Sequence, residues 1–421
     1  MHAIEKILAN KSGKDKVQTG EIVNAKIDLA EVNDLYLQVI KSFREMGGQK
    51  VWDKDKVSFV FDHYSPAPTL KAADNHKQMR EFCNKQGIDK LFDINKGICH
   101  QVLPEAGLVY PGMILAATDS HTTTHGAFGA FGTGVGATDL ASILISGELW
   151  FKVPEVIKIE INGELKAGVM AKDIILNILG ELGQDAAVYK AVEFTGSTVE
   201  EMDIDERMVL CNMAVEMGAK TSYIEPDHKT YQFLKDRINV EYDPIFTDED
   251  YEYDEVYEFE VDELTPLTAK PHSIDNIAPV QEVNEEKIDQ IFIGTCTGGR
   301  LNDLKTAAKI IKGHKVADGV RLLVIPASDE VYQKALDAGY LDIFLKSGAT
   351  VSNPGCGPCL GAHQGVLASG ESCLSTSSRN FPGRMGSTEA KIYSVSPATA
   401  AISAIKGRLV KAEESDLNGD N

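Results

Sequence analysis

Three cysteines lie in two glycine-rich segments whose composition suits a metal centre. Cys296 lies in GTCTGG, and Cys356 and Cys359 lie in NPGCGPCLGAH. Three thiolates at one site suit a 4Fe-4S cluster, and a cluster held by only three cysteines leaves one iron without a protein thiolate. Such an iron can bind a substrate oxygen as a Lewis acid. The neighbouring glycines fit this chemistry because a cluster needs the backbone to approach its sulfurs closely.

The same residues are compatible with two other kinds of site. CGPC is also a dithiol redox motif, although Gly361 and Gly365 interrupt the segment in which that motif normally begins a helix. A structural zinc could use the three cysteines together with His363, but the second CxxC pair that would strengthen this hypothesis is absent from the sequence. We interpret the other four cysteines as small buried apolar residues: Cys83, Cys99, Cys211 and Cys373. Seven thinly spread cysteines do not favour a disulfide framework.

Histidines beside carboxylates form a second group of candidates. They are Asp62 and His63 in FDHYSP, His100 in NKGICHQV, and Asp119, Ser120 and His121 in TDSHTTTHG, with the serine between the last pair. A carboxylate next to an imidazole tunes the ring for proton transfer. A single histidine is more often structural, so it is their clustering at expected strand ends that indicates acid–base chemistry.

A third group consists of side chains that could hold a substrate. Asn212 and Glu216 in CNMAVE are spaced to share one face of a helix whose neighbouring residues are apolar. Arg379 and Arg384 lie in SRNFPGR, and guanidinium groups are well shaped to bind carboxylates. Two arginines close to a cluster predict a di- or tricarboxylate substrate.

The elements that must place these groups alternate between strands and helices. In the first half we expect strands at 57–61, at 113–119 and from 156, with helices at 137–151 and 205–217, the last ending at Gly218. In the last third we expect strands at 289–294, 320–325 and 349–353 and helices at 303–312 and 329–338. Parallel sheets bind ligands at the carboxyl ends of their strands, so the two cysteine segments are expected to converge on one edge.

The predicted fold class is α/β, with three α/β domains at 1–154, 155–270 and 271–421. Residues 264–279 contain several prolines and are expected to form a linker. Residues 247–264 alternate acids with aromatic or apolar residues, which is typical of a strand with one wet face.

The glycine-rich run 126–136 does not directly follow a strand, as a dinucleotide-binding loop would. We therefore expect it to let the backbone pass close to a cofactor or substrate.

Composition excludes several classes of function. The 421 residues have a formal charge of -21, which disfavours nucleic-acid binding because that affinity depends on lysine and arginine neutralising phosphates. Apolar residues make up 43% and charged residues 25%, as in soluble globular proteins. No signal peptide and no apolar run of membrane-spanning length is found in the sequence, so a cytoplasmic protein is expected.

In their order along the chain, the motifs resemble the aconitase superfamily. The set covers residues 62–386 and comprises DH, H, DSHT, the glycine-rich run, CNMAVE, GTCTGG, GCGPC and SRNFPGR. It is most similar to the two-chain branch, which includes the large subunits of 3-isopropylmalate dehydratase and homoaconitase. The resemblance implies a hydro-lyase of leucine biosynthesis that interconverts 2-isopropylmalate and 3-isopropylmalate by dehydration and rehydration. Homocitrate and methylmalate-type acids are alternative substrates, and a dithiol oxidoreductase is a distant alternative.

The resemblance also implies roles for the candidate residues. One 4Fe-4S cluster per chain would be held by Cys296, Cys356 and Cys359. Near the leaving hydroxyl, Asp62 would pair with His63, which helps to protonate it; His100 would pair with Asp119, and His121 with Glu216. The iron ligands would have Ser120 and Asn212 nearby, and the substrate carboxylates would be bound by Arg379 and Arg384.

In the two-chain branch a separate small subunit carries the fourth, swivelling domain and the serine that acts as base. The resemblance therefore implies that this chain has three α/β domains of the aconitase type, lacks the fourth swivelling domain and is inactive alone. Two positions depart from the family, which commonly has asparagine in place of Ser378 and of Gly298. The family's early glutamine contact is expected near Asn33 and Asp34.

Overall fold

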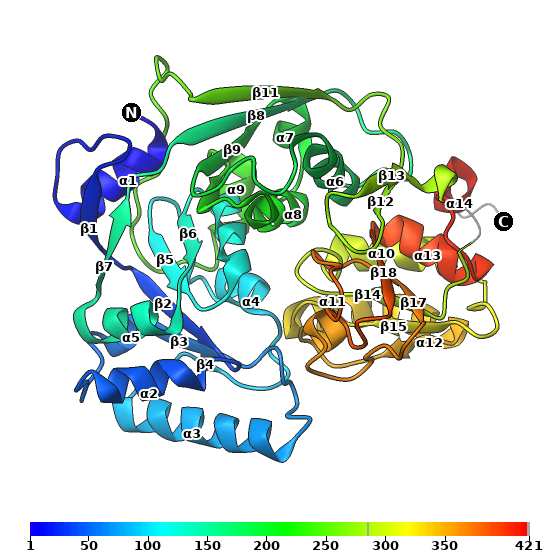
Figure 1. Cartoon of the computed structure of the whole chain (residues 1–421), viewed down its shortest axis with the longest axis horizontal. Coiled ribbons are helices and arrows are strands. Elements are labelled where there is room, and N and C mark those ends of the chain that lie inside the picture. The colour runs from blue at the N-terminus through cyan, green and yellow to red at the C-terminus, as the bar shows by residue number, and fades with distance from the viewer. Residues whose placement is uncertain (284–285, 419–421) are drawn as a thin grey trace.

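The computed structural model describes residues 1–283 and 286–418, in which four β-sheets are surrounded by helices (Figure 1). The first large sheet is parallel throughout, in the order β4-β3-β2-β5-β6. Its strands are β2 (Leu29–Asn33), β3 (Val57–Val60), β4 (Leu91–Phe92), β5 (Ile114–Ala117) and β6 (Phe131–Gly134). Every position of β3 and β5 is buried, as is usual in a parallel sheet covered on both faces.

Among the helices around this sheet, α2 and α3 lie side by side at the bottom of Figure 1. The helices are α1 (Ala3–Ser12), α2 (Leu37–Glu45), α3 (Leu70–Gln86), α4 (Cys99–Glu105) and α5 (Ala137–Ser146), with short 3-10 helices η1 (Lys54–Lys56) and η2 (Ser120–Phe128). Strands β1 (Ile22–Lys26) and β7 (Glu148–Lys152) form a separate antiparallel pair.

The second large sheet is also parallel, in the order β10-β9-β8-β11. Its strands are β8 (Val156–Asn162), β9 (Ala191–Thr195), β10 (Thr221–Tyr223) and β11 (Glu255–Glu260). The accompanying helices are α6 (Ala171–Leu182), α7 (Ser197–Glu201), α8 (Ile204–Met213), α9 (His228–Leu234) and the 3-10 helix η3 (Ala214–Met217). Gly218 ends η3 with a φ of 86°, which confirms the predicted glycine stop.

The third sheet has the order β13-β12-β18-β17-β14-β15-β16, and β14 to β18 are parallel. Its strands are β12 (Leu267–Ala269), β13 (Ile277–Pro279), β14 (Gln290–Ile293), β15 (Arg321–Val324), β16 (Thr350–Val351), β17 (Ser372–Ser375) and β18 (Lys391–Val395). The helices are α10 (Leu301–Ile311), α11 (Asp329–Asp337), α12 (Tyr340–Ser347), α13 (Pro397–Lys406), α14 (Glu414–Asn418), and the 3-10 helices η4 (Val280–Glu282) and η5 (Gly357–Leu360). The cysteine and arginine segments follow the carboxyl ends of β14, β16 and β17.

Three predictions about individual elements are wrong in part. The expected linker at 264–279 contains β12 and β13, which extend the edge of the third sheet by antiparallel pairing with β18 and with each other. The expected helix at 137–151 stops at Ser146, because Gly147 adopts a left-handed conformation and the next residues pair as β7 with β1. Within 247–264, only Glu255–Glu260 forms a strand.

The domain boundaries at 154/155 and 270/271 remain predictions. Side-chain packing crosses the first boundary, and a sheet crosses the second. One hydrophobic core includes Leu115 and Phe128 from the first part of the chain and Ile159 and Leu210 from the second. Strand β12, which precedes the second boundary, belongs to the third sheet. Within the two described stretches, every helix is too short or too polar to traverse a bilayer.

Candidate active site

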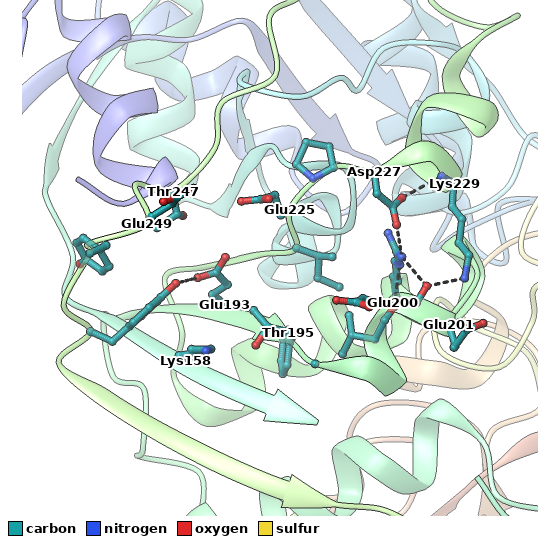
Figure 2. Close-up of a pocket in the computed structure, with 18 of the residues that line it drawn as sticks. Lys158, Glu193, Thr195, Glu200, Glu201, Glu225, Asp227, Lys229, Thr247 and Glu249 are labelled. Atoms are coloured by element: carbon teal, nitrogen blue, oxygen red, sulfur yellow. Dashed lines mark hydrogen bonds and ion pairs between the residues drawn. The ribbon is translucent and has the colours of Figure 1, made fainter. Parts of the chain in front are cut away.

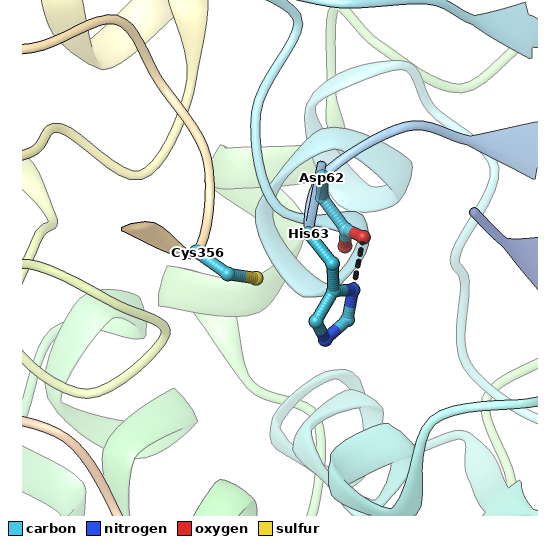
Figure 3. Close-up of side chains that lie close together, drawn as sticks. All are labelled: Asp62, His63 and Cys356. Carbon is cyan, nitrogen blue, oxygen red and sulfur yellow. Dashed lines mark hydrogen bonds and ion pairs between the residues drawn. The ribbon is translucent and has the colours of Figure 1, made fainter. Parts of the chain in front are cut away.

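Asp62 and His63 follow β3 and form the first histidine–carboxylate pair. His63 Nδ1 lies 2.6 Å from Asp62 Oδ1, and the Cys99 amide donates to Asp62 Oδ2 at 3.0 Å. Figure 3 shows this pair opposite Cys356, which lies on a segment of the third part of the chain. The Cys356 amide donates to the Asp62 carbonyl at 2.8 Å. This backbone contact fixes the end of β3 against the cysteine segment.

The surroundings of His63 favour its protonated form. Burial acts to lower its pKa, but Cys356 and the carboxylates of Asp62 and Asp34 outweigh this effect and raise the pKa of His63 well above its ordinary value. Asp34 lies behind the ring, where it accepts hydrogen bonds from the His63 amide at 3.1 Å and from His76 Nε2 at 3.1 Å. A histidine that keeps its proton at neutral pH is suited to act as a general acid.

Asp119, which follows β5, is the shared acceptor of a second group. Its Oδ1 lies 3.1 Å from His100 Nε2 and accepts the His121 amide at 2.8 Å, and its Oδ2 lies 3.8 Å from His63 Nε2. Burial acts to raise the pKa of Asp119, but hydrogen bonds from His100 and His121 reverse the effect and hold it well below its ordinary value. Asp119 is therefore an ionised carboxylate surrounded by three imidazoles.

Glu216, at the end of the α8–η3 segment, connects a histidine to a substrate-binding candidate. Its Oε1 lies 2.8 Å from His121 Nε2 and accepts from Arg379 Nε at 2.7 Å. Burial acts to raise the pKa of Glu216, and the His121 and Arg379 contacts lower it below its ordinary value. Ser378 Oγ lies 3.0 Å from the same His121 nitrogen. Ser378, one of the two departures from the family pattern, thus contacts a predicted catalytic histidine directly.

The three predicted cysteine ligands belong to one buried cluster of apolar side chains. Burial is the main reason that the pKa of Cys296 rises to about 12 and that the pKa of Cys356 rises well above its ordinary value. Arg384 Nη2 lies 3.6 Å from Cys359 Sγ, and Asn212 lies beside the Cys296 thiol. The second and third groups of candidates therefore adjoin the cysteines.

The arrangement does not suit a single zinc ion held by the cysteines. Zinc ligands lie about 4 Å or less from one another. Among the described residues, the only set of three or more His, Cys, Asp or Glu ligands within 4.8 Å of one another is Asp62, His63 and Cys356. His363 is engaged elsewhere, because its Nε2 lies 2.7 Å from the Pro66 carbonyl. The zinc hypothesis with His363 as fourth ligand is therefore wrong.

A cavity of about 390 Å³ lies where these groups meet. Six of the predicted site residues line it: His63, Asp119, Ser120, His121, Arg379 and Arg384. The other seven support these side chains from behind or form the cysteine cluster: Asp62, His100, Asn212, Glu216, Cys296, Cys356 and Cys359. The cavity thus joins proton-handling groups from the first sheet to guanidinium groups from the third.

A larger cavity, of about 780 Å³, lies on the second sheet and contains none of the predicted site residues (Figure 2). Its charged groups are partly satisfied by one another. Glu193 contacts His2 Nε2 at 3.1 Å and accepts from the Tyr253 hydroxyl, and Asp227 binds Arg207 at 2.6 Å. Volume alone therefore does not identify the site, whereas convergence of matched acid, base and guanidinium groups does.

Comparison with known proteins agrees with this geometry. Residues 5–287 and 278–407 match the model of the aconitase family (aconitate hydratase). The chain belongs to the aconitase family. A probable 3-isopropylmalate dehydratase large subunit from Methanothermobacter thermautotrophicus is 52% identical over 97% of this chain and 98% of its own length.

Two further relatives have similar identities, and one solved structure is similar in fold. A 3-isopropylmalate dehydratase large subunit from Methanopyrus kandleri is 51% identical over 96% of this chain and 97% of its own. A probable methanogen homoaconitase large subunit from Methanothermobacter thermautotrophicus is 48% identical over 100% of this chain and 99% of its own. The solved structure of aconitase X from Thermococcus kodakaraensis is similar in fold, with a TM-score of 0.51, 15% identity, and 90% and 89% of the two chains covered.

Several residues that contact the candidate site were missed by the sequence reasoning. Asp34, considered only as part of a possible glutamine position, supports His63 and does not line the cavity, which Leu35 and Tyr36 line instead. Arg300 is fully buried and donates to the Cys296 carbonyl and to Gln101 Oε1. The NDLY and GGRL sequences carry no pattern that distinguishes these residues from surface ones.

The glycines serve mainly to pack backbone against backbone. A Cβ at Gly132 would lie 2.3 Å from the Thr122 carbonyl, and one at Gly134 would lie 2.7 Å from the Asp119 carbonyl. Gly134 also lines the cavity, so the expectation for the glycine-rich run describes only part of its role. At Gly298, the other departure, a Cβ would lie 2.3 Å from Thr376, which leaves no room for an asparagine side chain.

Proposed function

We propose that this chain is the large subunit of a 3-isopropylmalate dehydratase, which interconverts 2-isopropylmalate and 3-isopropylmalate by dehydration and rehydration. The observation that carries the proposal is the single cavity in which two carboxylate-bonded histidines, His63 and His121, meet two arginines beside buried cysteines. Full-length similarity to large subunits of that name supports the substrate class. The alternative, a homoaconitase large subunit, is supported by a relative of 48% identity.

The cofactor in this proposal is a 4Fe-4S cluster held by Cys296, Cys356 and Cys359. The donor set fits, because soft thiolates favour iron-sulfur clusters and these three thiols share one buried apolar cluster. Arg384 and Asn212 lie beside two of the sulfurs and can donate to them. When bound, such a cluster supplies a Lewis-acidic iron for a hydroxyl and a carboxylate oxygen.

The side chains of the cavity then have distinct tasks. Arg379 and Arg384 bind the substrate carboxylates; Arg379 already binds Glu216 through Nε, which orients the guanidinium group. His63 Nε2 donates a proton to the departing hydroxyl, and Asp62 holds the other ring nitrogen. The Asp119 and Glu216 carboxylates keep His100 and His121 in place.

Removal of the proton next to a carboxylate also needs a base. The histidines that line the cavity are already bonded to carboxylates, and we propose that a small subunit provides the base. The name "large subunit" given to the relatives is consistent with a second chain. The buried, poorly ionised thiol of Cys356 makes the alternative of a dithiol oxidoreductase less suitable, since thiolates are the reactive species.

The decisive experiment reconstitutes the chain anaerobically with iron and sulfide and titrates in the small subunit of a related dehydratase. The complex is assayed by chromatography with isopropylmalate, homocitrate and methylmalate. We expect isopropylmalate to have the highest kcat/KM and the isolated large chain to be inactive. Preference for homocitrate would favour the alternative, and equal activity with and without the small subunit would refute the proposal of a shared site.

A further inference from the structure

Lys172 is a buried lysine close to the cysteine segment. It lies in the first turn of α6 and is 1% exposed. Its ammonium donates to the Ser377 carbonyl at 2.8 Å and to the Thr376 carbonyl at 3.1 Å, and lies 3.4 Å from Thr297 Oγ1. Helix α6 accompanies the second sheet, whereas all three acceptors belong to loops of the third. This one side chain therefore connects the two parts of the molecule.

The acceptors of Lys172 belong to the two loops that carry the site. Thr297 follows Cys296, and its hydroxyl donates to the Thr376 carbonyl at 2.6 Å, so the loops are also joined to each other. Ser377 precedes Ser378 and Arg379, which contact His121 and Glu216. A change in the position of the ammonium would be transmitted to a predicted cluster ligand and to a predicted substrate-binding arginine.

The charge of Lys172 has no carboxylate within hydrogen-bond distance among its described contacts, all of which are neutral oxygens. Burying an unpaired ammonium is costly, and neutral hydrogen bonds offset only part of the cost. Burial lowers the pKa of Lys172 to about 8, and the acidic groups that oppose this most strongly are Cys296, Cys359 and then Glu216. Thr297, a contact of this ammonium, directly follows Cys296, so the negative charge of a metal-bound cysteine site would lie close to Lys172.

We propose that Lys172 is a positioning residue for the iron-sulfur site, where its positive charge stabilises the cysteine thiolates and the anionic cluster that they hold. The inference rests on the proposed cluster function. Because a nearby cation favours the form that has gained an electron, Lys172 raises the reduction potential of the cluster and slows loss of iron.

The test uses the reconstituted large chain in complex with a small subunit and measures the midpoint potential by redox titration followed by electron paramagnetic resonance. The main variant is Lys172→Gln, which is neutral but still donates hydrogen bonds to the carbonyls. We expect about a tenfold lower ratio of reduced to oxidised cluster at a given potential, which is about 59 mV for a one-electron couple. Iron loss to a chelator is expected to be several-fold faster.

Two further variants separate charge from general structure. Lys172→Arg keeps the charge and is expected to retain most of the wild-type potential. Lys305→Gln is the matched control. Lys305 is exposed and lines, together with Lys172, a cavity of about 290 Å³, and its substitution removes the same charge. Its potential and its rate of iron loss are expected to equal those of the wild type.

An unchanged potential in Lys172→Gln, or an equal loss in Lys172→Arg, would overturn the inference. If Lys172→Gln does not fold, Thr297→Val supplies the second measurement, since it removes a contact of the ammonium and leaves its charge. We expect faster iron loss at an unchanged potential, and unchanged iron loss would overturn the positioning role. Failure of the wild-type chain to form any cluster would instead refute the proposed function, which is a distinguishable result.

Discussion

The two sheet edges that meet at the cavity differ in chemistry. The edge of the first sheet contributes Asp62, His63 and Asp119, in which each carboxylate is bonded to an imidazole. The edge of the third sheet contributes thiols and guanidinium groups, such as Cys359 and Arg384. The proposed function assigns proton transfer to the first edge and the binding of a soft metal centre and of anions to the third. Each edge is chemically incomplete without the other.

The pKa shifts of the acidic groups also differ between the two edges. At the first edge the pKa of Asp119 is lowered, because hydrogen bonds from two histidines overcome burial. At the third edge the pKa of Cys296 rises to about 12, because burial is not balanced by a strong partner. The first edge is thus charged and self-compensated, whereas the thiols of the third need a metal to become thiolates. The following predictions test this contrast.

The largest effect is expected for Cys356→Ser, which removes a proposed ligand from the third edge. The 4Fe-4S absorption and paramagnetic signals should be lost, and activity of the complex should fall to background, because two thiolates are too few to retain the cluster. Cys83→Ser is the matched control, since Cys83 is buried in α3 and should not affect the signals. Retention of the full signal in Cys356→Ser would contradict the ligand assignment.

A large effect of a different kind is expected for His63→Gln at the first edge. Loss of a general acid should lower kcat by about 10²–10⁴-fold while the cluster signals remain. His314→Gln, a substitution far along the chain in the loop after α10, should behave as the wild type. Loss of the cluster in His63→Gln would show that the two edges do not divide the chemistry as described.

Arg379→Lys is expected to have an intermediate effect. A lysine cannot keep the contact with Glu216 and bind a carboxylate with two parallel hydrogen bonds, so KM should rise by about 10–100-fold, in line with the loss of one or two charge-assisted hydrogen bonds. Steady-state kinetics measures this, with the exposed Arg44→Lys as control. An unchanged KM together with a lower kcat would assign Arg379 to catalysis rather than to substrate binding.

The smallest effect concerns stability and pH in the cluster-free chain. Burial raises the pKa of Asp303 to about 7, above the value of about 4 expected in the unfolded chain. The favourable contribution of Asp303 to the free energy of unfolding is therefore present below about pH 4 and is lost as the pH rises through about 7. Asp303→Asn should melt a few degrees higher than the wild type at pH 8, with the difference shrinking toward pH 5. Calorimetry at both pH values checks this, and a difference independent of pH would contradict it.

For Asp119 the pH dependence of the contribution to stability has the opposite sign to that for Asp303. Its folded pKa lies well below the ordinary value, so its contribution is present above about pH 4 and is lost as the pH falls through the folded pKa. Asp119→Asn should therefore destabilise the chain at pH 8 and less at acid pH. The same pair of calorimetric scans compares a carboxylate of the first edge with one buried beside the third.

Some of the site could be predicted because it depends on short-range rules. Cys296 follows β14 and Cys356 follows β16, and the rule that parallel strands bind ligands at their carboxyl ends predicts that both lie on one edge. Asp62 and His63 are neighbours in the sequence and bond to each other. The order of the motifs was enough to indicate the aconitase family, which the comparisons confirm.

Other contacts could not be predicted from the sequence pattern. His121 and Glu216 are 95 residues apart, Arg379 and Glu216 are 163 apart, and Lys172 and Ser377 are 205 apart. The pairing of His121 with Glu216 was expected only from the resemblance. The contacts of Lys172, Asp34 and Ser378 with the site had no sequence signal, because the residue type alone does not show whether a polar side chain is buried or exposed.

The sequence by itself determined which chemical groups are available and on which kind of element each would lie, because side-chain chemistry, strand patterns and glycine stops are local properties. The tertiary structure decided which thiol, carboxylate or ammonium is buried and which partner it meets. Those two factors set the charge state of each group, since a pKa depends on desolvation and on neighbours from distant parts of the chain. The same reason explains why Lys172, one lysine among many in the sequence, is buried against the loops that carry the proposed iron-sulfur site.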